Sequence, residues 1–155
     1  MKKYMFVEIS CVIFVVLFIF FSTNNETKSS KSAEEISAEL IDVFNDDALV
    51  ERGAEHIKKA FNIDLSDFSS YSYYSTDDVM NVGEYFVGVL AEGANEDFND
   101  LFENYTSEKF VLYNGYAPMQ AAYLDNYVFV VSKGVVLFCV GENAELLLDA
   151  FYSTV

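Results

Sequence analysis

The fold of this chain is decided by residues 127–140, Tyr127-Val-Phe-Val-Val-Ser-Lys-Gly-Val-Val-Leu-Phe-Cys-Val140. Two apolar runs, 127–131 and 135–140, flank a Ser-Lys-Gly turn, and this pattern predicts a β-hairpin. Both runs are apolar at nearly every position, which is unusual when only one face of a sheet meets helices. Either the first helix of the chain covers the second face, or that face docks onto a partner.

Helical and strand patterns flank the hairpin. Ser32 and Glu35 form a capping box at the start of one helix, and apolar residues then recur at helical spacing. Gly115 and Pro118 are predicted to end the central helix. The elements predicted in this way are helices over about 33–45, 48–61 and 95–113, a last helix that Asn143 caps, and strands over 68–75 and 84–91.

These elements predict an α+β domain over residues 33–155. Strands joined by tight hairpins pair antiparallel, and helices kept in separate blocks pack on one face of the sheet. We therefore expect two layers, with helices on one face of a four-stranded antiparallel sheet. Residues 24–32 are polar without an apolar period and predict a flexible tether.

The first 23 residues predict a membrane segment. Lys2 and Lys3 precede an apolar run, and Tyr4–Phe21 supplies 18 residues, above the lower limit of about 17 for a spanning helix. The small-residue pattern of a cleavage site is missing, because the bulky Phe20 and Phe21 occupy its position. We expect a transmembrane anchor over residues 4–21, with a cleaved signal peptide or a core helix as alternatives. The two lysines are expected to stay in the cytoplasm, so the domain would be extracytoplasmic.

The chain is strongly acidic. It has 9 Lys and Arg against 25 Asp and Glu, a formal net charge of −16 at pH 7. This charge disfavours nucleic acid and anionic lipid head groups as partners. It is typical of a solvated surface, and the alternative interpretation is that it attracts cations or a basic partner. Cys11 lies in the apolar run and Cys139 in a predicted strand, so no disulfide between them is expected.

Catalytic and metal signatures are missing from the sequence. The one histidine, His56, cannot build a zinc site alone and is expected on a helix surface. Asn95–Thr106 opens like a calcium loop but lacks its sixth-position Gly and twelfth-position Glu. The acidic pairs Asp46-Asp47 and Asp77-Asp78 are predicted to be solvated turns. No cofactor or metal is expected, although glycosidase-type carboxylate pairs stay open because any two of the acids could converge in the fold.

Tyrosines supply the candidate binding surface. Tyr71 and Tyr73 on the strand 68–75, with Tyr85 and Tyr127 near the neighbouring edge, are predicted to contact a protein or cell-wall partner. Tyrosine suits such a surface because it offers a large apolar area and a polar tip with few rotatable bonds. The alternative is that these rings lie beneath the first helix, whose apolar residues must also be buried.

The C-terminal half resembles a known family. Tyr116-Ala-Pro118-Met-Gln120, the hairpin 126–134 and the segment 142–151 are similar to small exported or membrane-anchored bacterial proteins that share domain of unknown function 4358. The resemblance extends over about residues 35–152 and implies an N-terminal signal or anchor, a polar tether and one α+β domain. It implies no catalytic residue. We therefore expect a membrane-anchored extracytoplasmic binding or structural module of the bacterial cell envelope, or alternatively a cell-envelope hydrolase that uses paired carboxylates.

Overall fold

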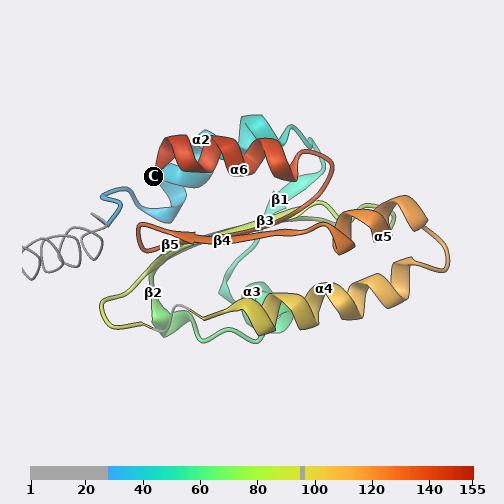
Figure 1. Cartoon of the computed structure of the whole chain (residues 1–155), viewed down its shortest axis with the longest axis horizontal. Helices are drawn as coiled ribbons and strands as arrows, with labels where there is room; N and C mark the ends of the chain where they lie inside the picture. The colour runs from blue at the N-terminus through green and yellow to red at the C-terminus, as the bar shows by residue number, and fades with distance from the viewer. Residues whose placement is uncertain (1–27, 95–96) are drawn as a thin grey trace, which may run out of the picture.

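The computed structural model describes residues 28–94 and 97–155, which form an α+β domain around one antiparallel sheet (Figure 1). The helices are α2 (Ala33–Phe44), α3 (Ala54–Phe61), α4 (Asn99–Tyr113), α5 (Pro118–Asp125) and α6 (Ala144–Thr154), with the 3-10 turn η1 (Leu65–Asp67); the strands are β1 (Leu49–Glu51), β2 (Phe68–Thr76), β3 (Glu84–Leu90), β4 (Val128–Ser132) and β5 (Val135–Val140). The strand order is β1-β2-β3-β5-β4, and neighbours pair antiparallel.

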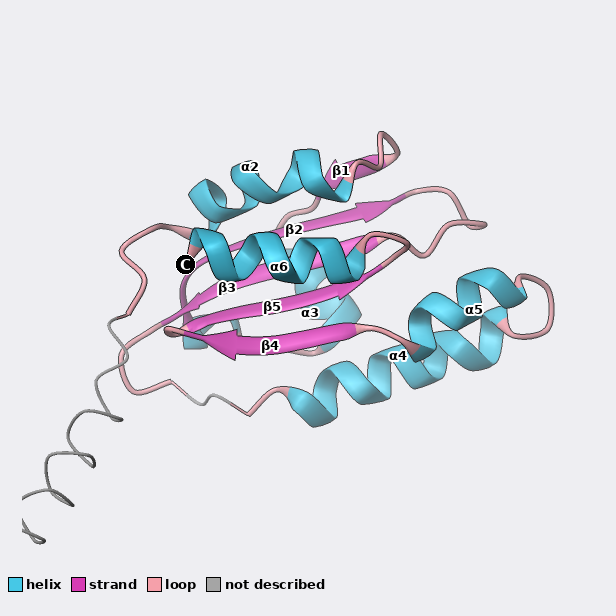
Figure 2. Ribbon diagram, turned by 45° about the horizontal axis from the view of Figure 1, so that its top comes forward, coloured by secondary structure: helices cyan, strands magenta, loops and turns pink. Residues whose placement is uncertain are grey.

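The α+β class and the antiparallel sheet are confirmed, but the predicted layering is wrong. Helices α2 and α6 lie on one face of the sheet and α3 and α4 on the other, which gives three layers (Figures 1 and 2). The interior strand β5 is buried at every position because both faces of the sheet are covered. This explains why the sequence of β5 is apolar throughout. The first helix, α2, covers part of one face, which was one of the two alternatives for the hairpin.

The sheet has five strands where four were predicted. The extra strand, β1, lies inside the segment predicted to be a helix over 48–61, of which only α3 is helical. Helix α5 was also missed, because Pro118 was taken to end the central helix. Proline instead occupies the first turn of α5, where its missing N–H is not needed.

Two predicted caps have different outcomes. The capping box is confirmed, since the Ser32 hydroxyl accepts from Glu35 N and the Glu35 carboxylate accepts from Ser32 N. Asn143 precedes α6, but its side chain makes no capping bond there and donates to the Phe44 carbonyl instead, at 2.9 Å. The predicted cap Asn95 lies outside the described residues.

Each face of the sheet has its own core. The face under α3 and α4 is aromatic: Phe61 packs edge-to-face against several rings, and Phe102 stacks on Phe138 with centroids 4.4 Å apart. The face under α2 and α6 is mainly aliphatic, with Leu40 and Leu147 among its fully buried residues. Neither core is left open, so the fold buries the large aromatic content of the chain on both sides of one sheet.

The two ends of the sheet differ. At one end, which we call the hairpin end, the turn Lys133–Gly134 joins β4 to β5, and Ser29 N donates to the Lys133 carbonyl at 3.0 Å. The described chain therefore enters at the hairpin end. At the other end, which we call the pocket end, α2 ends, β3 begins and β5 ends, beside α5 (Figure 2). The six residues of β5 separate the two ends by roughly 20 Å.

No helix within residues 28–94 and 97–155 has the length and apolar character needed to cross a membrane. The predicted anchor, residues 4–21, lies outside these residues.

Candidate functional site

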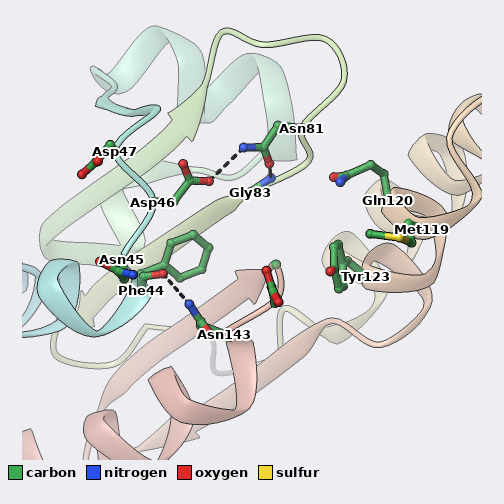
Figure 3. Close-up of a pocket in the computed structure, with 12 residues that line it drawn as sticks. Phe44, Asn45, Asp46, Asp47, Asn81, Gly83, Met119, Gln120, Tyr123 and Asn143 are labelled. Carbon is green, nitrogen blue, oxygen red and sulfur yellow. Dashed lines mark hydrogen bonds between the residues drawn. The ribbon is translucent and has the colours of Figure 1, made fainter.

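The pocket end holds a cavity of about 340 Å³, which we call the acidic pocket (Figure 3). Four segments that are far apart in the chain build it: the end of α2, the loop before β3, the helix α5, and the turn between β5 and α6. Its lining consists of Phe44, Asn45, Asp46, Asp47, Asn81, Gly83, Met119, Gln120, Tyr123, Gly141, Glu142 and Asn143. Most of these side chains are polar, so the cavity suits a polar ligand.

One wall of the acidic pocket is held by Asp46. Its Oδ1 accepts from Ala48 N at 2.9 Å, and its Oδ2 accepts from Asn81 Nδ2 at 2.9 Å (Figure 3). Asn81 Oδ1 in turn accepts from Gly83 N at 2.7 Å. The bond to Oδ2 ties the end of α2 to the loop before β3, whereas the bond to Oδ1 is local. Asp46 therefore shapes this wall of the pocket.

Two further amide side chains hold the opposite walls. Gln120 on α5 accepts from Val82 N at 2.9 Å, and Asn143 donates to the Phe44 carbonyl at the end of α2. The backbone at Gly141 passes directly under the Phe44 ring with φ of 151°, and a Cβ there would lie 2.7 Å from Phe44 Cζ. Only glycine fits this close approach. The pocket is therefore fixed by bonds and contacts between distant segments.

The charge of the acidic pocket is negative. Asp46, Asp47 and Glu142 line it, and no Lys or Arg is among the described lining residues. Asp47 and Glu142 are exposed at its rim. Within the described part of the chain, no group of three or more His, Cys, Asp or Glu side chains is arranged to hold a metal ion. The arrangement fits an organic ligand that carries positive charge or several N–H donors.

A second cavity of about 270 Å³ lies at the same end, and we call it the tyrosine pocket. Asn81 and Gly83 line both cavities, so the loop before β3 separates them. The tyrosine pocket is lined by Tyr73, Ser75, Thr76, Asp77, Asp78, Val79, Asn81, Val82, Gly83, Glu84, Tyr105, Lys109 and Tyr113. The two pockets together occupy the ends of β2, β3 and β5.

A charged cluster forms one wall of the tyrosine pocket. Glu84, which is only 1% exposed, accepts from the hydroxyls of Tyr73 and Tyr105 at 2.7 and 2.8 Å and from Lys109 Nζ at 2.9 Å. Lys109 Nζ also donates to the Tyr105 hydroxyl at 2.7 Å. Burial and the nearby negative charge of Glu84 raise the pKa of both tyrosines. We call these four residues the Glu84 cluster.

The four tyrosines predicted to form one surface do not share an exposed face. Tyr73 is buried under α3 and α4, and Tyr85 is buried on the opposite face, where its hydroxyl donates to the Ser37 carbonyl of α2. Tyr71 and Tyr127 are half-buried against the aromatic core. Successive residues of a strand point to opposite faces, so Tyr71 and Tyr73 share the face under α3 and α4 with Tyr127, whereas Tyr85 lies on the other face. Binding of a partner by these tyrosines stays a prediction. Tyr73 lines the tyrosine pocket, and Tyr127 lines a third cavity, of about 370 Å³, between α4 and α5.

Most residues of the two pockets were missed as site residues by sequence reasoning. Asp46-Asp47 and Asp77-Asp78 were interpreted as solvated turns, and Gln120 entered only through the family resemblance. Glu84 gave no signal, because an acid at the start of a strand is typical of an exposed position. His56 is exposed on α3, as expected, and lines neither pocket.

The fold and its two pockets define a small α+β domain with a polar cavity at one end of its sheet. A family model matches residues 42–141 and is described as a domain of unknown function (DUF4358). The chain belongs to this family. No curated protein and no solved structure matches the chain.

Proposed function

We propose that this protein is a membrane-anchored binding module of the bacterial cell envelope, with its folded domain outside the cytoplasm. The apolar run Tyr4–Phe21 supports the anchor, because it is long enough to span a bilayer. The predicted tether 24–32 joins the anchor to the domain and reaches it at the hairpin end, where Ser29 is bonded to the hairpin turn. The acidic pocket lies at the opposite end of the sheet.

The observation that carries the binding function is the acidic pocket itself. Ligand sites are concave, largely pre-formed and furnished with a few fixed polar groups. Here, distant segments are tied together around a cavity by the side-chain bonds of Asp46, Asn81, Gln120 and Asn143. The exposed Asp47 and Glu142 add negative charge at the rim. The ligand that fits this lining carries one or more amines, as the peptides of bacterial cell walls do.

Fragments released from purified cell wall by enzymatic digestion test this proposal. The full-length chain in lipid nanodiscs is titrated by calorimetry with these fragments and with the same fragments after acetylation of their amines. Binding should be weakened about tenfold by acetylation and by the double variant Asp47→Asn/Glu142→Gln, because each removes charge attraction at the rim. The control variant Glu55→Gln/Glu108→Gln removes the same charge from exposed positions outside the pocket. Equal affinity for native and acetylated fragments would refute the proposal.

A second candidate is a cell-envelope hydrolase, favoured by the presence of three carboxylates in one pocket. Asp46 holds the pocket wall through its two hydrogen bonds, and the proposed catalytic pair is Asp47 and Glu142, which are exposed at the rim. Hydrolysis of purified cell wall, followed as release of reducing ends, separates the two functions. A binding module releases none. Release that is lost in Glu142→Gln while the fold persists would establish the hydrolase instead.

A further inference from the structure

The Glu84 cluster has a composition that the fold alone does not require. Removing an ion from water costs several kcal/mol, and well-packed apolar residues often replace a buried ion pair without loss of stability. Strand β3 is otherwise apolar and buried, yet it begins with a buried carboxylate. Buried ionisable groups that face a cavity are typical of functional sites. The tyrosine pocket is therefore a second candidate site, separate from the acidic pocket.

The unused hydrogen-bonding groups of the tyrosine pocket indicate what it can bind. Lys109 Nζ has three N–H donors, of which Glu84 and Tyr105 take two. Thr76 Oγ1 accepts from Asp78 N, which leaves its O–H free to donate. Asp78 Oδ1 accepts from Met80 N, and its second oxygen remains as an acceptor. The pocket thus offers both donors and acceptors to a ligand.

The charges of the tyrosine pocket repel an anion, and Lys109 repels the part of a cation that lies beside it. An anion would meet three carboxylates, Glu84 inside and Asp77 and Asp78 at the rim, of which Asp77 is already paired with Arg52 at 2.6 Å. A cation would meet the ammonium group of Lys109, which keeps 27% of its side-chain surface exposed beside the cavity. The Lys109–Glu84 pair is neutral as a whole. A neutral ligand with several groups that both donate and accept meets neither repulsion.

We propose that the tyrosine pocket binds one neutral sugar ring, whose hydroxyls bond to Lys109, Thr76 and Asp78. Each sugar hydroxyl donates one hydrogen bond and accepts others, which matches the mixture of groups that the pocket leaves unused. Tyr113 also lines the cavity and supplies an aromatic ring for the C–H face of the sugar. This site is additional to the proposed function, because it uses a different cavity and a ligand of different charge.

Four sugars of similar shape test the charge argument. The full-length chain in nanodiscs is titrated with glucose, N-acetylglucosamine, glucosamine and glucuronate, which are neutral, neutral, cationic and anionic at pH 7. At least one neutral sugar should bind with a dissociation constant of roughly 1 mM, typical of a ligand with so few atoms. Glucuronate should bind about tenfold more weakly than that neutral sugar, because it meets the carboxylates of the pocket, and glucosamine should bind no more tightly, because its amine meets Lys109. Tighter binding of either charged sugar, or saturable binding of none, would overturn the proposal.

A pair of variants identifies the cavity. Lys109→Met alone leaves Glu84 buried without its partner, so the double variant Glu84→Gln/Lys109→Met is used to keep the cluster neutral and the chain folded. It should lower the affinity for the neutral sugar about tenfold or more, because it removes the Lys109 donor. Lys59→Met, at an exposed position on α3, is the matched control and should bind as the unchanged protein does. Thr76→Val tests the same wall independently, with an expected loss of roughly threefold to tenfold. Unchanged sugar affinity in both pocket variants would show that the site is elsewhere.

Discussion

The hairpin end and the pocket end of the sheet are built in different ways. At the hairpin end, the turn at Lys133–Gly134 and the capping box of Ser32 are local, and one long-range backbone bond, from Ser29 N to the Lys133 carbonyl, joins the start of the described chain to the turn. At the pocket end, hydrogen bonds join residues 35, 38 and 99 positions apart, and two cavities remain between the joined segments. The difference teaches that a tight turn, a helix cap and a backbone bond close the fold at one end, whereas long-range side-chain bonds hold the other end and leave two cavities there, where a ligand can enter.

Removal of one charge should have very different effects at the two ends. At the pocket end, Lys109→Met leaves the buried Glu84 carboxylate unpaired and should lower the free energy of unfolding by about 3–5 kcal/mol. At the hairpin end, Lys31 pairs with the exposed Glu39, and Lys31→Met should leave the denaturation midpoint unchanged. Urea denaturation measures both. Recovery of most of the loss in Glu84→Gln/Lys109→Met would identify the unpaired charge as the cause, and equal effects of the two single variants would contradict the comparison.

Glycine replacements should sharpen the same contrast. In Gly141→Ala at the pocket end, the new methyl group meets the Phe44 ring at 2.7 Å in addition to an unfavourable φ, so a loss of about 3 kcal/mol is expected. In Gly134→Ala at the hairpin end, φ is 75° but the nearest neighbour is the Lys28 side chain at 3.5 Å, and a loss of about 1 kcal/mol is expected. Thermal denaturation gives the order. A smaller loss in Gly141→Ala than in Gly134→Ala would mean that the Phe44 ring moves at little cost to accommodate the new methyl group.

High pH should weaken the pocket end through its tyrosines. Burial and the charge of Glu84 raise the pKa of Tyr73 and Tyr105 in the folded state, whereas in the unfolded chain these tyrosines ionise near pH 10. Their stabilisation is therefore fully present below about pH 10 and is lost as the pH rises above it, because only the unfolded state gains from ionisation. The free energy of unfolding should fall by about 1.4 kcal/mol per tyrosine per pH unit. Tyr73→Phe/Tyr105→Phe should reduce this slope, and an unchanged slope would exclude the cluster as its source.

The smallest of these effects is expected at the hairpin end. Ser32→Ala removes the hydroxyl that accepts from Glu35 N at the start of α2, which should lower the free energy of unfolding by about 1 kcal/mol. Ser32→Asp keeps an acceptor at this position and is the matched control. A loss as large as that of Lys109→Met would contradict the comparison of the two ends.

The features that could be predicted from the sequence are those that depend on neighbouring residues. The capping box at Ser32 and the hairpin turn at Gly134 are local, and both are present in the structure. Strand β1 was missed because three residues are too few to set a period, and its pairing with β2 is what makes it a strand. Helix α5 was missed because Pro118 can either follow a helix or begin one.

The candidate site was harder to predict for the same reason. Asn81, Gln120 and Asn143 are ordinary polar residues in the sequence and become pocket walls only when distant segments meet. In the sequence, Glu84 is typical of an exposed strand end. In the fold, α4 covers it and Lys109 donates a hydrogen bond to it. The sequence shows that tyrosines are abundant in these strands but not to which face of the sheet each ring points, because this depends on strand register.

One labelling experiment tests the central claim, that the acidic pocket opens outside the cell and binds there. Met119, which is 70% exposed at the rim of the acidic pocket, is changed to Cys in a full-length chain that also carries Cys11→Ser. The remaining Cys139 is buried, and burial together with the charge of Glu84 raises the pKa of its thiol, so it should not react. A membrane-impermeant maleimide should label Met119→Cys in intact cells, and added amine-bearing cell-wall fragments should slow the labelling. Labelling only after lysis would contradict the account.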